Sequence, residues 1–195
     1  LGFSKELVNI FPKLCVKDIS KMIRHVILSP RNNPLDKFWF KHSEEERGNF
    51  SVDFSRACAW ILAQDSESFK FDAFKDIEQI SISQLQDQSQ YTFKNNTRYP
   101  PLIRYMKLLG FIEPGLGHGN RLVADPTNAV IEELEGVFDG KQEISSNEFI
   151  EKLGEKVPVL DGGSLRREVE KNLSANWSRP RERTLSKSLT RALYK

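Results

Sequence analysis

The stretch that most constrains the fold runs from residue 91 to residue 126, because it carries helix, turn and strand signals in close succession. From Pro101, apolar residues recur at helical spacing, and Gly110 then ends the predicted helix. Two short segments, Phe111 to Pro114 and Asn120 to Ala124, have the length of strands. The turn between them contains glycines that tolerate positive φ, namely Gly115, Gly117 and Gly119. A helix followed by a glycine-tipped β-hairpin is therefore expected.

The segments before this stretch are predicted to be helical. Residues 16–28 carry an apolar face, and residues 51–64 give the clearest helical pattern, with Ser51 as a plausible N-cap. Residues 69–77 have helical or mixed character, and residues 80–90 are polar with Ile82 and Leu85 as apolar anchors. The order helix, connection, helix, helix, strand, turn, strand is that of a winged helix. We therefore predict an N-terminal helical segment (residues 1–50) and a winged-helix domain (residues 51–138).

The rest of the chain repeats the helical order. Asp125-Pro126-Thr127 begins a helix that ends near Gly136, and the turn at 139–141 is the best internal boundary. A capping box at 145–148, a break at Gly162-Gly163-Ser164 and a final amphipathic helix over 185–193 predict three helices, with 157–160 extended. Because the chain stops where a wing would begin, residues 139–195 are predicted to form a second, incomplete winged helix. The expected fold class is mainly α with small β-hairpins (α+β), built as a tandem winged-helix or helix-turn-helix protein.

Charge is distributed unevenly along the chain. The net charge is +2, but residues 164–195 hold nine Lys or Arg against three Glu, a net of +6. The first 163 residues carry a net of −4. A basic end on a slightly acidic body favours a polyanionic partner such as DNA, although a solvated helical face explains the same pattern.

The remaining composition narrows the class of protein. Cys15 and Cys58 form neither a disulfide framework nor a metal-binding pattern, which fits a reducing cytoplasm. No apolar run reaches transmembrane length and no signal peptide is visible, so no membrane association is expected. We expect no cofactor and no metal.

Residues that could contact DNA gather around the predicted recognition helix and its wing. Arg can bond guanine in bidentate fashion, Asn can do so with adenine, and cations bind phosphates. The candidates in this first unit are Lys94, Asn96, Thr97, Arg98, Arg104, Lys107, His118 and Arg121. The start of the helix has two alternatives, because prolines disfavour helix before themselves: it begins at Pro101, or Thr97 caps it and Pro100 and Pro101 occupy the first turn. A winged helix that contacts only proteins is also consistent with these residues, and His118 equally fits a solvated turn.

The second unit supplies a basic loop that enters a helix, an arrangement suited to binding phosphates. Its candidates are Arg179, Arg181, Arg183, Lys187 and Arg191. Trp177 beside this loop could stack on a base, but we favour an anchor to the core. The aromatic residues Phe38, Trp39 and Phe40 likewise allow base stacking, and packing against the next helix is favoured.

The sequence contains no pattern typical of an enzyme. The Gly115–Gly119 spacing neither opens a helix after a strand nor precedes Gly-Lys-Ser/Thr, so a phosphate-binding loop is rejected. His25 lies in an apolar-patterned helix and is interpreted as a core histidine, and His42 lies beside an acidic run. Cys58 lies in a helix predicted to be buried, without a nucleophile signature.

Two resemblances support this interpretation. Residues 97–112, with the hairpin after them, resemble the winged-helix superfamily. The same segment, through Pro100, Leu102, Met106 and Leu109-Gly110-Phe111, together with the terminal Leu189-Thr-Arg-Ala-Leu-Tyr-Lys, is similar to DpdG-type proteins. The resemblance implies an accessory role in bacterial genomic islands that insert 7-deazaguanine bases into DNA and restrict foreign DNA, without enzymatic activity.

The sequence therefore predicts a double-stranded DNA-binding, non-catalytic component of a bacterial defence or DNA-modification and restriction system. The alternative is a protein–protein scaffold that uses its winged helices for complex assembly, with other defence-system proteins as partners. A catalytic role is the least favoured reading. Self-association, the DNA sequence preference and the partners are left open.

Overall fold

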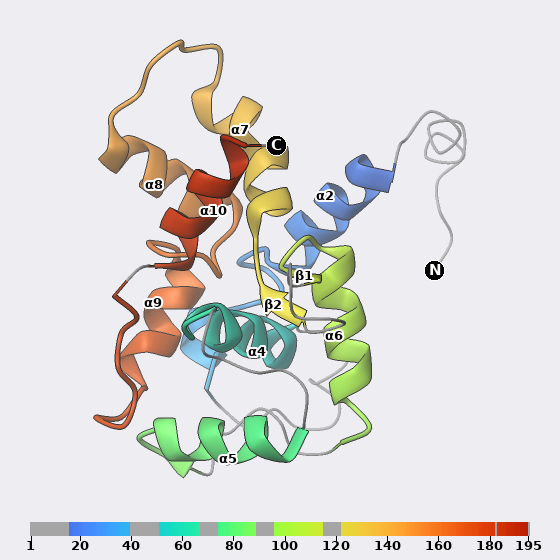
Figure 1. The fold of residues 1–195 in the computed structure, drawn as a ribbon, viewed down its shortest axis with the longest axis vertical. Helices are drawn as coiled ribbons and strands as arrows, with labels where there is room; N and C mark the ends of the chain where they lie inside the picture. The colour runs from blue at the N-terminus through green and yellow to red at the C-terminus, as the bar shows by residue number, and fades with distance from the viewer. Residues whose placement is uncertain are drawn as a thin grey trace.

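The computed structural model describes residues 16–39, 51–66, 74–88, 96–114, 122–181 and 183–194, which form helices and one two-stranded hairpin (Figure 1). The predicted α+β class, mainly helical with a small hairpin, is confirmed. The elements in chain order are α2 (Val16–Ile27), the short 3-10 helix η2 (Leu35–Lys37), α4 (Val52–Leu62), α5 (Phe74–Gln84), α6 (Tyr99–Leu108), β1 (Ile112–Pro114), β2 (Leu122–Ala124), α7 (Thr127–Phe138), α8 (Ser146–Lys156), α9 (Ser164–Lys171) and α10 (Thr184–Ala192).

The predicted helix and hairpin form as expected. Strands β1 and β2 pair antiparallel, with Ile112 opposite Ala124 and Pro114 opposite Leu122. Gly110 connects α6 to β1 at a φ of 77°, and a Cβ at this position would lie 3.0 Å from the backbone nitrogen of Ala129. Glycine therefore satisfies both the left-handed backbone and the close approach of α7. The predicted turn glycines 115, 117 and 119 lie outside the described residues.

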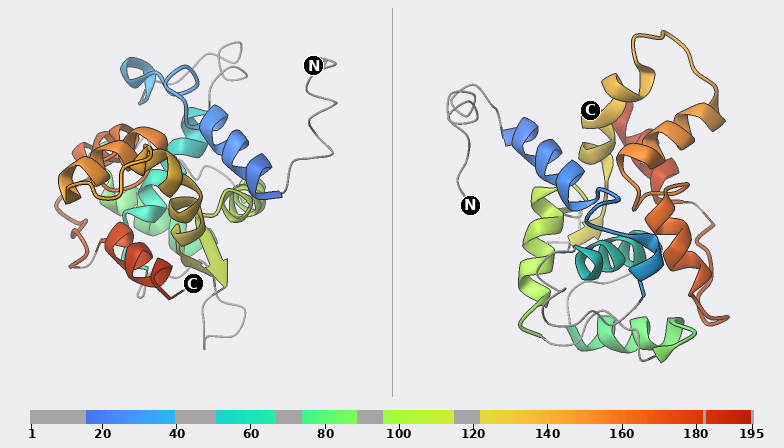
Figure 2. Two further views of the ribbon diagram at one scale, coloured as in Figure 1. Left: turned by 90° about the horizontal axis from the view of Figure 1, so that it is seen from above. Right: turned by 180° about the vertical axis from the view of Figure 1, so that it is seen from behind.

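Helix α4 lies at the centre of the molecule (Figure 1). Nearly all of its side chains are buried because its sequence, VDFSRACAWIL, is apolar on more than one face. Helix α9 packs against one side of it. On the opposite side lies α6 (Figure 2, right). The Phe54 ring of α4 meets the Tyr105 ring of α6 edge to face. Helix α5 lies across one end of the molecule (Figure 1), and its Gln84 accepts from the Trp60 indole of α4.

Helices from the two predicted domains pack against one another. Helices α8 and α10 both pack on α7, α9 packs on α4, and α2 contacts α7. Leu85 and Leu173 form an isolated antiparallel bridge that joins the segment after α5 to the segment after α9. The buried apolar side chains of the described residues form one continuous cluster. The divisions at residues 50 and 138 and the winged-helix assignment remain predictions, and contacts cross both boundaries.

The expectation of an extended segment at 157–160 is wrong. Leu160 N donates to Val157 O at 3.0 Å, which closes a tight turn between α8 and α9. All four residues are buried, and the backbone carbonyl of Pro158 accepts from Arg166 N at 2.9 Å. A short apolar run fits a buried turn as well as a strand, so its pattern alone does not separate the two.

Candidate nucleic-acid interface

Helix α6 presents one buried face and one exposed face, as its spacing predicts. Leu102, Met106 and Leu109 are buried in the core. The exposed residues are Pro100, Pro101, Arg104, Tyr105, Lys107 and Leu108. Within the described ranges neither Arg104 nor Lys107 forms an ion pair, so both cations are directed to solvent. We call the surface formed by these six exposed residues the α6 face. It combines two cations with apolar side chains.

The structure selects between the two predicted helix starts. Tyr99 is the first helical residue and both prolines lie in the first turn, so a start at Pro101 is wrong. The N-cap position is held by Arg98 rather than Thr97, and no side chain caps the helix. The two prolines have no N–H, so the first turn has fewer free donors than an ordinary helix start.

The residues before α6 are exposed. Asn96, Thr97 and Arg98 are all open to solvent, next to the start of the α6 face. The Arg98 guanidinium lies 3.8 Å from an oxygen of Asp53 on α4, with both side chains largely exposed. Three further candidates lie outside the described residues, namely Lys94, His118 and Arg121.

Three of the five candidate cations of the second unit form ion pairs within the protein. Arg179 pairs with Glu170 at 2.7 Å, Lys187 with Asp65 at 3.0 Å, and Arg191 with Asp125 at 2.9 Å. Asp65 follows α4 and Asp125 precedes α7, so two of these pairs join α10 to the first unit. The positive charge of the second unit is therefore partly neutralised, by Asp65 and Asp125 of the acidic body and by Glu170 of the unit itself. Arg181 and Arg183 remain exposed and form no ion pair with another described residue.

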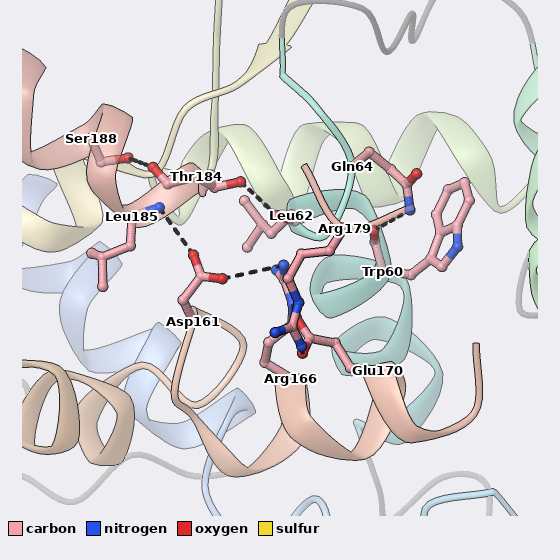
Figure 3. Close-up of polar contacts among 10 residues, drawn as sticks. All are labelled: Trp60, Leu62, Gln64, Asp161, Arg166, Glu170, Arg179, Thr184, Leu185 and Ser188. Atoms are coloured by element: carbon pink, nitrogen blue, oxygen red, sulfur yellow. Dashed lines mark hydrogen bonds and ion pairs between the residues drawn. The ribbon is translucent and has the colours of Figure 1, made fainter. Parts of the chain in front are cut away.

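A cluster that the sequence reading missed holds α9 and α10 together (Figure 3). Asp161 is buried, accepts from Leu185 N at 3.1 Å with one oxygen, and lies 3.4 Å from the Arg166 guanidinium with the other. Arg166 is also buried and donates to Glu170 at 2.8 Å. Asp161 accepts from an N–H in the first turn of α10 and so acts as an N-terminal cap for this helix. It lies in the turn between α8 and α9, far from α10 in sequence.

Helix α10 is also fixed to α4 through its first residue. The Thr184 hydroxyl donates to Leu62 O at 2.7 Å, and Ser188 donates back to Thr184 O at 2.8 Å (Figure 3). Both side chains are buried. No local sequence signal marks the bond from Thr184 to Leu62, since the two residues are far apart in the chain.

A second missed cluster joins α2 to α7. Arg24 is fully buried, and its guanidinium donates to Glu132 and Glu133 at 2.9 Å each and to Leu109 O at 2.9 Å. Glu133 is also fully buried, and Lys21 lies 3.6 Å from its other oxygen. The Arg24–Glu133 ion pair therefore holds α2 against α7, because either charge without its partner in the core would be strongly unfavourable.

The interpretation of His25 as a core histidine is wrong. Its ring is partly exposed, and Nε2 lies 2.8 Å from the buried Glu133 carboxylate. The carboxylate comes from a helix distant in sequence, so spacing around His25 could not reveal it. Throughout the described ranges, no three His, Cys, Asp or Glu side chains gather in a way that would hold a metal ion.

The aromatic residues pack as the favoured interpretation predicts. Phe38 is fully buried and meets the Trp39 ring edge to face at 5.7 Å. Trp39 is half-buried, and the Arg56 guanidinium lies 5.4 Å above its ring. Trp177 is half-buried against the core, with the Arg179 guanidinium 6.0 Å from its ring. Phe40 lies outside the described residues.

Cys58 is fully buried in α4, as expected, and burial raises the pKa of its thiol well above the usual value because the thiolate would lose its hydration. An inert neutral thiol is the result. Cys15 lies outside the described residues. None of the described helices combines the length and apolar character needed to cross a bilayer.

Comparison with known proteins agrees with one of the two resemblances. Neither the curated proteins nor the solved structures gave a match to this chain. A family model described as DpdG-like matches residues 8–195, which is nearly the whole chain. Membership in this family suggests an accessory protein of a DNA-modification system. The chain therefore belongs to the DpdG-like family.

Proposed function

We propose that this protein is a non-catalytic, DNA-binding component of a DNA-modification and restriction system, and that the α6 face contacts duplex DNA. The observation that carries the proposal is the exposure of Arg104 and Lys107 on one helix, with no ion pair to another described residue. Cations directed to solvent can neutralise phosphates and release counterions on binding. The exposed Asn96, Thr97 and Arg98 extend this surface toward the start of the helix.

The second unit has a smaller part in this proposal than its net charge suggests. Helices α6 and α9 lie on opposite sides of α4 (Figures 1 and 2), and Arg179, Lys187 and Arg191 pair with carboxylates. Of the five candidate cations of that unit, Arg181 and Arg183 are best placed for additional phosphate contacts, because both are exposed and neither forms an ion pair with another described residue. The non-catalytic part of the proposal rests on the sequence, which carries no motif of an enzyme.

The test is duplex binding at several salt concentrations, measured by fluorescence anisotropy. Removing two phosphate contacts with Arg104→Ala and Lys107→Ala should reduce the slope of log Kobs against log salt by about 2. The matched control removes two exposed cations from α9, with Arg167→Ala and Lys171→Ala, and should leave the slope nearly unchanged. Absence of wild-type binding even at low salt would overturn the proposal.

A protein-binding scaffold is the second candidate function. It is favoured by Met22 and Val26, which lie one turn apart on α2 and are both exposed. An apolar pair on the outer side of a helix suits a partner helix better than a phosphate backbone. If Val26→Gln releases a co-purifying protein while the Arg104 and Lys107 variants change nothing, this function is supported instead.

A further inference from the structure

The α6 face carries a row of exposed apolar side chains beside its two cations. Tyr105 is 51% exposed and Leu108 is 42% exposed, whereas Leu102 and Met106 on the other face of the helix are buried. Pro100 and Pro101 continue the same exposed surface into the first turn. The Tyr105 ring is held in place by its edge-to-face contact with Phe54. A single exposed Leu would need no explanation, but a contiguous apolar surface next to cations suggests a ligand with both features.

The start of this helix is poorly suited to binding a phosphate through its backbone. Ordinary helix N-termini bind anions with free N–H groups. Here both prolines in the first turn lack that donor. Contacts from the α6 face must therefore come from side chains, and the surface at the helix start is apolar.

The side chains of α6 match only part of the base-recognition code of the major groove. Its sequence, YPPLIRYMKL, contains no Asn or Gln to read adenine and no Asp or Glu to accept from cytosine. Arg104 and Lys107 can bond phosphates as well as guanine, whereas an apolar side chain suits the C5-methyl group of thymine. Residues 104 and 108 are about 6 Å apart along the helix axis, which corresponds to about two base-pair steps.

We propose that Tyr105 and Leu108 contact thymine C5-methyl groups in the major groove, so that the protein prefers thymine-containing duplexes. This inference rests on the proposed function, since it requires the α6 face to enter the groove. The neighbouring cations would hold the phosphates while the apolar pair supplies the discrimination.

The experiment compares two pools of random-sequence duplex DNA, one made with thymidine and one with deoxyuridine throughout. Deoxyuridine lacks the C5-methyl group and keeps the same pairing edge. Burying one methyl group should strengthen binding about fourfold, so the wild type should bind the thymidine pool at least that much more tightly. The double variant Leu108→Gln with Tyr105→Gln should bind both pools equally. The Tyr105→Phe variant should keep the preference for the thymidine pool. Arg104→Ala should weaken binding to both pools while leaving the ratio intact.

The outcomes separate the two proposals. Equal binding of both pools by the wild type overturns the thymine preference and leaves DNA binding in place. If the Leu108→Gln, Tyr105→Gln variant still binds the thymidine pool more tightly, the thymine proposal is also overturned, because the methyl contact then lies elsewhere. No binding to either pool overturns the proposed function itself. Circular dichroism of each variant confirms that the fold is retained.

Discussion

An oxygen of Asp125, at the start of α7, lies 2.9 Å from the guanidinium of Arg191 near the end of α10. The other oxygen of Asp125 accepts from Thr127 N at 3.1 Å and from the Thr127 hydroxyl. One carboxylate thus holds the first turn of α7 and ties the last helix to it. A cation predicted to contact DNA is engaged within the protein.

Asp125→Ala should therefore destabilise the protein more than Arg191→Ala. The first change removes a buried acceptor from Thr127 and should lower the free energy of unfolding by about 1–2 kcal/mol. The second removes only a partly exposed ion pair, worth less than about 1 kcal/mol. Urea unfolding of both variants checks the order. If Arg191→Ala proves as costly as Asp125→Ala, the Thr127 bonds contribute little.

Loss of Glu133 should be among the most damaging single changes in the described structure. Glu133→Leu leaves the fully buried Arg24 with a lost partner, and should lower the free energy of unfolding by about 3–5 kcal/mol. Thermal and urea unfolding measure the loss. The double variant Arg24→Met with Glu133→Leu should recover much of it, because both fully buried charges are removed and the remaining carboxylate of Glu132 is partly exposed. Lys21→Ala is the control and should cost less than about 1 kcal/mol.

Asp161→Ala should loosen α10 selectively. The change leaves Leu185 N without its side-chain acceptor and removes one carboxylate from Arg166, with an expected cost of about 2–3 kcal/mol. Amide hydrogen exchange should accelerate in α10 more than in α6, which makes none of these contacts. Arg179→Ala removes the exposed member of the same cluster and serves as the mild control. Uniform exchange across both helices would contradict the capping role of Asp161.

Cys58 should make stability depend on pH above neutrality. Its pKa is raised by burial in the folded state, so folding binds a proton that the unfolded thiol releases above about pH 8.5. The contribution is fully present below that pH, and it should fall by about 1.4 kcal/mol for each further pH unit until the folded thiol ionises.

Comparison of the wild type with Cys58→Ala by urea unfolding between pH 7 and 10 isolates this contribution from other titrating groups. The stability difference between the two proteins should shrink as the pH rises. A Cys15→Ser background avoids interference from the other thiol. A constant difference across the range would mean that Cys58 is not protected from ionisation.

The local sequence was sufficient for most of the elements. Apolar spacing predicted α2, α4 and α6, the Gly110 break predicted the end of α6, and Ser145 caps α8 by accepting from Glu148 N. These features depend on neighbours within a few residues, which one-dimensional patterns contain. The candidate cations of α6 were placed correctly on its exposed side for the same reason.

Only the tertiary structure decided which charges are open to a partner. The sequence predicted the same DNA-contacting role for the cations of α6 and for those of the second unit. Packing, however, places a carboxylate beside Arg179, Lys187 and Arg191. The turn at 157–160 and the Arg24–Glu133 pair also depend on contacts between distant segments. Helical spacing determines which way a side chain points along its own helix. It cannot determine what the fold places opposite, because that depends on how distant helices pack around the shared core.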